Sequence, residues 1–195
     1  MSLQRKDLSL LDAPIRYARQ QALEGVGEAG QQLFFSTEVV CEGEGAALQT
    51  AAAYLEAAGF CLALRTAPFY PGFWPSAWQK KADAKPCAAP SPAALAACSR
   101  RGFLGQLPCA CPEGFDFWVL MGCLQGNPSF LFARGPMKPF LDAPLEALSA
   151  KSPAVQGMLA AWAALVFEKL ALGLLPKTGG GSLGPSGRAR LWGAP

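Results

Sequence analysis

Cysteine thiols are the groups in this sequence best suited to chemistry, because a thiolate can attack electrophiles, exchange disulfides and bind soft metals. Four of the seven cysteines share one irregular segment, and these are weak metal-ligand candidates: Cys87, Cys98, Cys109 and Cys111. Zinc and iron–sulfur sites usually take such ligands in pairs about two to four residues apart. Because Cys98 also falls within a predicted helix, we expect these sulfurs not to converge. A redox pair and simple buried thiols are the other interpretations.

The sequence contains no histidine. This removes Ser-His-Asp and Cys-His catalysis, HExxH metalloproteases and the usual proton shuttle near neutral pH. An enzyme built on this chain would have to work with Glu, Asp, Lys, Tyr or Cys, and most enzymes do not work under that restriction. The sequence therefore favours a protein that is not an enzyme and uses no cofactor. A thiol-dependent or Cys-metal enzyme is the alternative.

The stretch "CEGEGAALQ" places Gly43 and Gly45 between a predicted strand and a predicted helix, where phosphate-binding loops lie. The third glycine and the lysine of such loops are missing. In addition, Glu42 and Glu44 would repel a phosphate, although they suit the positive end of the helix dipole as structural residues. We therefore expect no nucleotide at this loop.

The stretch "APFYPGFWPSAWQKK" gathers large rings among prolines and ends in two lysines. Aromatic side chains on a stiff loop beside cations are typical of contacts with a partner protein or a membrane surface, because large rings lose little entropy when they are buried. The other interpretation, which the sequence favours for most of the rings, is that the loop folds back over the sheet and the rings complete the core. As partner-binding residues we predict Phe69, Tyr70, Phe73, Trp74 and Trp78.

The stretch "GMLAAWAALVFEKLALGLL", residues 157–175, is apolar on every side of a helical wheel, yet contains Glu168 and Lys169. Its length permits a membrane span, but each charge near the centre would cost about 2.5 to 3.5 kcal/mol. A helix packed between its own sheet and a partner protein fits better, with the two charges meeting water at the seam. We predict Trp162 and Phe167 as partner contacts, and a tail-anchored membrane protein is a further alternative.

The elements that position these residues begin with an amphipathic helix from Leu8 to Leu33, in which Gly25 and Gly27 are weak points. The apolar run 33–41 then predicts a strand. Residues 45–59 predict a helix that ends at a glycine cap, and 60–66 predict a second strand. Strand, helix and strand in this order form a βαβ unit with parallel strands.

The second half of the chain predicts a helix from Ser91 to Arg101 and a β-hairpin with its turn near Gly126 and Asn127. The remaining expectations are a short helical piece at Pro144–Leu148, a C-terminal helix at 153–175, and a Gly/Ser/Pro-rich flexible tail at 176–195. The predicted fold is a single α+β domain over residues 1–175. It combines the βαβ unit and the hairpin in one small sheet with helices packed on it, and carries a long irregular insertion at 68–114.

Composition points to a covered surface. Hydrophobic residues make up 51% and charged residues 16%, against about 25% charged residues in ordinary soluble proteins. A net charge of +3, dispersed along the chain, argues against nucleic acid as a partner. The N-terminus lacks a secretory signal, so we expect an intracellular reducing compartment, either free in it or peripheral to a membrane. The sequence favours a non-catalytic accessory or scaffolding subunit that binds other protein subunits through the C-terminal helix and the 68–80 loop, with membrane contact left open.

Overall fold

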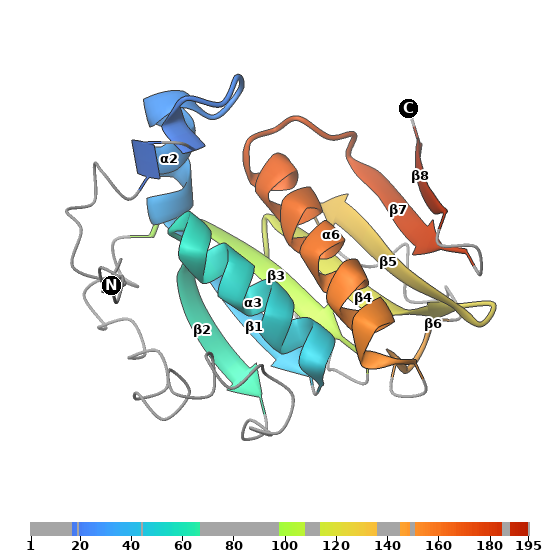
Figure 1. The fold of residues 1–195 in the computed structure, drawn as a ribbon. Coiled ribbons are helices and arrows are strands. Elements are labelled where there is room, and N and C mark those ends of the chain that lie inside the picture. The colour runs from blue at the N-terminus through green and yellow to red at the C-terminus, as the bar shows by residue number, and fades with distance from the viewer. Residues whose placement is uncertain are drawn as a thin grey trace, which may run out of the picture.

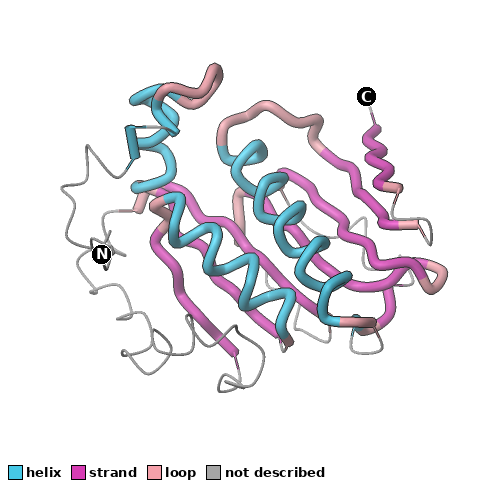
Figure 2. Tube along the Cα trace, in the orientation of Figure 1, coloured by secondary structure: helices cyan, strands magenta, loops and turns pink. Residues whose placement is uncertain are grey.

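A computed structural model shows one mixed sheet of eight strands with helices packed on it, which confirms the predicted α+β fold (Figure 1). It describes residues 17–18, 20–43, 45–66, 98–107, 114–135, 145–148, 151–184 and 188–194. Along the sheet the strands run in the order β2-β1-β3-β4-β5-β7-β8, and β6 pairs with β4. Figure 2 shows α3 and α6 side by side across one face of the sheet.

The βαβ unit consists of β1 (Thr37–Gly43), α3 (Ala46–Ala58) and β2 (Cys61–Thr66), and its two strands are parallel as predicted. The helix ends where the sequence indicates, because Gly59 adopts a left-handed φ of 106° and donates its N–H to the carbonyls of Leu55 and Glu56. The predicted strand at 33–41 begins later than expected. Its first residues complete α2 (Gly27–Phe35).

The helix that precedes β1 is interrupted where the two glycines lie. Residues 17–18 and 20–21 are helical, residues 22–26 form turns, and α2 starts at Gly27. Both Gly25 (φ 84°) and Gly27 (φ 55°) occupy the left-handed region, which explains the predicted break. The earlier part of this predicted helix lies outside the described residues.

On the other side of β1 lies β3 (Arg100–Gln106), which is parallel to both β1 and β4. We predicted Arg100 and Arg101 as the last turn of a helix from Ser91, and this is wrong, because both residues open a strand. The Arg100 guanidinium donates to the carbonyl of Ala171 at 2.6 Å and lies over the Phe117 ring, so tertiary contacts override the local helix signal. Residues 91–97 lie outside the described part.

The antiparallel half of the sheet begins with the predicted hairpin of β4 (Phe117–Leu124) and β5 (Asn127–Arg134). Its two-residue turn is Gln125-Gly126, one residue earlier than predicted, and both residues have positive φ. Beyond the end of β3, β6 (Leu145–Glu146) pairs with the last residues of β4. A strand therefore stands where we predicted a helical piece at Pro144–Leu148.

The segment after residue 176 is not the flexible tail that its composition predicts. It forms β7 (Thr178–Leu183) and β8 (Ala189–Ala194), which continue the sheet from β5. The glycines of β7 make room for aromatic rings: a Cβ on Gly181 would lie 2.6 Å from Phe130 Cζ and 2.9 Å from Trp162 Cη2. Here glycine permits a close approach and does not indicate a linker.

The core lies between the sheet and its two main helices, α3 and α6 (Pro153–Ala171). The latter helix ends four residues before the predicted Leu175. Alternate residues of the central strands point to the opposite face of the sheet, where they form a second buried cluster. The central strands are thus apolar on both faces, which explains their continuous hydrophobic runs. That second cluster consists of Val40, Phe103, Trp118, Leu120, Leu131 and Ala133.

Candidate functional site

The glycine loop between β1 and α3 lies where the strand order reverses, since β2 flanks β1 on one side and β3 on the other. Ligands of parallel sheets commonly bind at this point, beyond the carboxyl ends of the strands. In this chain the Gln106 side chain fills the space. Its Oε1 accepts a hydrogen bond from the Leu48 N–H at 2.9 Å, and a Cβ on Gly43 or Gly45 would collide with Gln106. The two glycines thus make room for the backbone and the side chain of Gln106.

The described cysteines fall into two pairs by exposure. Cys41 and Cys123 are buried, whereas Cys61 and Cys98 are half-buried. Burial raises the pKa of Cys41 to about 12, so this thiol is an inert part of the core. Of the predicted metal candidates, Cys87, Cys109 and Cys111 lie outside the described residues. The part of the chain that the structure describes contains no group of three or more His, Cys, Asp or Glu residues able to hold a metal ion.

Cys61 and Cys98 meet at the start of the parallel strands. Cys61 is the first residue of β2, and its thiol donates to the carbonyl of Phe35 at 3.5 Å. The next carbonyl, that of Ser36, accepts the N–H of Ser99 at 2.9 Å, so one turn between α2 and β1 holds both segments. The Cys98 thiol hydrogen-bonds with Cys61. No sequence signal predicts this pair, because the two residues are 37 positions apart (98 minus 61) on separate segments.

The environment of Cys98 keeps its thiol protonated. Burial first, then the hydrogen bond to Cys61 and the nearby Cys61 and Glu38 groups, raise the pKa of Cys98 to about 11. Glu38 is itself held by Arg101, with 2.8 Å between Oε2 and Nε. Cys98 is therefore a proton donor toward Cys61 near neutral pH.

The side chains of α6 divide between the core and the surface. Phe167, which we predicted as a partner contact, is fully buried and packs against Phe60 and Phe117, with ring centroids 5.7 and 5.0 Å away. That prediction is wrong, because this side of the helix faces the sheet and Phe167 cannot touch a partner protein directly. Trp162 is half-buried and stands edge-on to Phe130, with centroids 4.8 Å apart.

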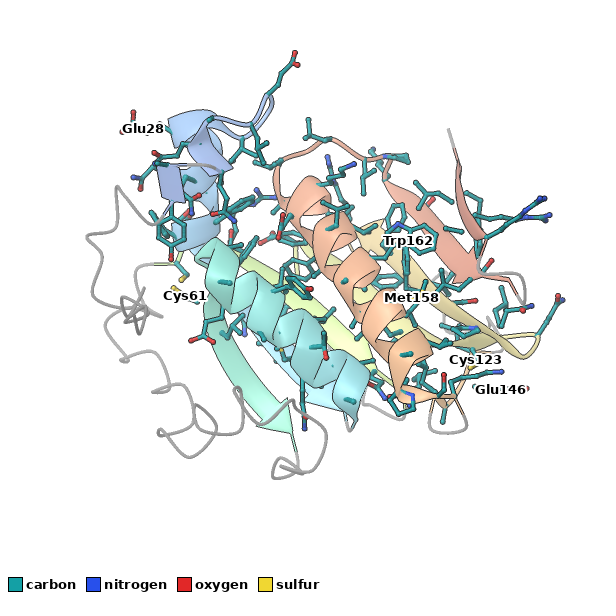
Figure 3. The ribbon with its side chains drawn as sticks, in the orientation of Figure 1. Glu28, Cys61, Cys123, Glu146, Met158 and Trp162 are labelled. Atoms are coloured by element: carbon teal, nitrogen blue, oxygen red, sulfur yellow. The ribbon has the colours of Figure 1, made fainter. Side chains whose placement is uncertain are left out.

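Large apolar side chains remain exposed on the same helix. Met158 is 53% exposed and Leu165 is 47% exposed. Met158, Trp162 and Leu165 follow one another at intervals of four and three residues, so they lie along one side of α6. We call these three residues the α6 outer surface, and Figure 3 shows Met158 and Trp162 on it. The five aromatic residues predicted on the other contact segment, Phe69, Tyr70, Phe73, Trp74 and Trp78, lie outside the described residues.

The two charges of α6 differ in environment. Lys169 is exposed, while Glu168 is half-buried and its pKa is raised to about 7 by that burial. The helix is long and apolar enough to cross a membrane, with 44% of it buried within the structure. A core helix of a globular protein passes the same test, and α6 packs on β4, β5 and α3.

Comparison with known proteins adds a likeness of fold. No protein family and no curated protein matches the sequence. The fold defines an α+β protein with a mixed eight-stranded sheet. Among solved structures it is similar to the one described as "Crystal Structure of SeMet PaaA", with a TM-score of 0.57 and 12% identity, covering 99% of this chain and 77% of that chain. At this identity the likeness shows the fold alone.

Proposed function

We propose that this protein is a non-catalytic accessory or scaffolding subunit that binds another protein through the α6 outer surface. The observation that carries the proposal is the exposure of Met158 and Leu165 beside the half-buried Trp162 on a single helix. A contiguous apolar patch that stays exposed on a folded domain is typical of an interaction site. Aromatic residues and methionine are also enriched in the centres of interfaces.

The composition supports the same function. With 16% charged residues, the chain has less polar surface than a solitary soluble protein usually carries. A partner that covers α6 would remove the exposed apolar area from water, which contributes about 25 cal/mol for each Å² buried. The 68–80 loop is the second contact in this proposal. In this proposal the protein works in an intracellular reducing compartment, either free in it or beside a membrane.

The packing of α6 favours a docked helix over a membrane anchor. Leu159, Ala163, Val166 and Leu170 are buried against the sheet and α3. Withdrawing this helix into a bilayer would expose the core that these residues close. Alkaline carbonate should therefore release the native protein from any membrane fraction. Retention in the lipid while partner proteins wash away would contradict the proposal and identify α6 as an anchor.

The direct test uses the double variant Met158→Gln with Leu165→Gln. Glutamine keeps the helix propensity of α6 and leaves the core side of the helix untouched. The native protein should purify with a partner at fixed stoichiometry, and the double variant should lose that partner while its urea unfolding curve stays unchanged. The matched control is Leu23→Gln, which alters an apolar residue that is 59% exposed in the turn before α2. Loss of the partner by the control, or its retention by the double variant, would refute the proposal.

A further inference from the structure

The Cys61–Cys98 pair differs from the other described cysteines in being both close together and accessible. Each thiol is half-buried, whereas Cys41 and Cys123 are buried. The two cysteines flank the first residues of β1. On one side, Cys61 of β2 is opposite Glu38. On the other side, Arg100 of β3, two residues after Cys98, is opposite Thr37. Small reagents can therefore reach two neighbouring sulfurs that the sheet holds in place.

We infer that Cys61 and Cys98 form a dithiol site that is converted to an intramolecular disulfide by exchange with a low-molecular-weight disulfide. In the first step a protein thiolate attacks the reagent, forms a mixed disulfide and releases one small thiolate. In the second step the other protein thiolate attacks the mixed disulfide and releases the second small thiolate. Two protons leave the cysteine thiols, and two electrons pass from their sulfurs to the reagent. A reducing compartment keeps the dithiol, and an oxidising shift closes it.

The surroundings assign an order to the two thiols. Among the described residues, the titratable and charged groups around Cys98 are Cys61 of β2, Glu38 of β1 and Arg101 of β3, which pairs with Glu38. Cys98 holds its proton and donates toward Cys61, so Cys61 is the attacking group and Cys98 is the resolving group. Burial and the nearby Glu38 carboxylate, which still act on Cys98 once Cys61 is in the mixed disulfide, keep this thiol protonated at neutral pH. Closure should therefore be slow at neutral pH and speed up as the pH rises.

Closing this bond would create a covalent loop over residues 61–98, which contains the aromatic segment predicted as the second contact surface. The bond would fix both ends of that loop to the start of the sheet. The proposal is independent of the proposed partner function, because disulfide closure needs no partner protein. Its readouts are covalent and can be followed on the isolated chain.

The experiment treats the full-length, reduced protein with oxidised glutathione, blocks the remaining thiols by alkylation and maps the linked peptides by mass spectrometry. The expected product has lost two hydrogens and links Cys61 to Cys98. The Cys98→Ser variant should stop at a glutathione adduct on Cys61, and Cys61→Ser should form no linked product. Cys123→Ser is the matched control and should close as the native chain does. Circular dichroism before oxidation confirms that each variant is folded.

Other results would overturn the inference. A bond from Cys61 or Cys98 to Cys87, Cys109 or Cys111 would show that the pair is not the site. Stable glutathione adducts on both residues without closure would show that the sulfurs cannot reach each other. A closure rate that does not change between pH 7 and 9 would contradict the assigned order of attack.

Discussion

Replacing Glu168 by Gln should stabilise the protein at alkaline pH and leave it unchanged at acidic pH. Burial raises the pKa of this carboxyl group from 4.5 to about 7 in the folded state. Between these two values the folded protein binds a proton that the unfolded chain has released, so the free energy of unfolding falls as pH rises through this window. Below pH 4.5 both states are protonated and the cost disappears. Above pH 7 both are ionised and the full cost applies.

The size of the effect follows from the shift. About 2.5 pH units at 1.36 kcal/mol each give roughly 3 kcal/mol at pH 8. This is an upper limit, because Glu168 is half-buried and keeps some contact with solvent. Glutamine has nearly the same shape and carries no charge, so the variant removes this cost without opening a cavity. In a chain of this length each kcal/mol corresponds to about 2 to 4 °C in Tm.

Urea unfolding followed by tryptophan fluorescence at pH 4, 6 and 8 measures the difference directly. The gain of Glu168→Gln should grow from near zero at pH 4 to its full value at pH 8. Glu56→Gln is the control, because it makes the same replacement at an exposed position on α3. A gain that is equal at all three pH values, or a variant that is less stable at pH 8, would refute the reasoning.

Four further substitutions test the packing described above. Gly157→Ala should raise stability by about 0.5 to 1 kcal/mol, because this glycine of α6 has open space where a Cβ would stand. Gly181→Ala should lower stability by at least as much, because its Cβ would meet Phe130 and Trp162. Thermal melting of both variants measures the two effects. Gln106→Leu should cost about 1 to 3 kcal/mol in denaturant unfolding, since it leaves the buried Leu48 N–H without its acceptor, and an unchanged midpoint would count against the loop geometry. Gly59→Ala should destabilise the protein by at least about 1 kcal/mol in the same assay, because Gly59 has a left-handed φ and the new Cβ would lie 2.6 Å from the Phe35 ring. A variant as stable as the native protein would contradict the proposed helix cap.

The elements that the sequence predicted well are those whose signals are local. An alanine-rich helix that ends at Gly59, flanked by apolar runs, is sufficient to predict a βαβ unit. The turn residues near Gly126 and Asn127 are sufficient to predict the hairpin, although its turn lies one residue earlier. The strands that were missed depend on partners distant in the chain. Arg100 opens β3 because Ala171 and Phe117 receive its side chain, and nothing near Arg100 in the sequence indicates that contact.

The candidate site likewise combines features that local sequence signals predict with features that depend on contacts between distant residues. An all-round apolar helix indicates that α6 must be covered, but it does not indicate which side faces the sheet. The sequence therefore predicted Trp162 and Phe167 alike as partner contacts. The structure buries Phe167 and leaves Met158 and Leu165 exposed. The Cys61–Cys98 pair was missed because its closeness depends on the position of β1 between β2 and β3.

The glycine run of β7 has a consequence for how the last two strands find their register. Three consecutive glycines give no side-chain alternation, so this stretch of β7 cannot by itself distinguish one alignment from a neighbouring one. The alignment is specified by rings from other elements: Trp162 of α6 and Phe130 of β5 lie against Gly181, and Trp192 of β8 lies against Gly180. Because α6 carries one of these rings, we expect the register of β7 to depend on the docking of that helix. The edge of the sheet should then be the last part of the protein to form and the first to slip.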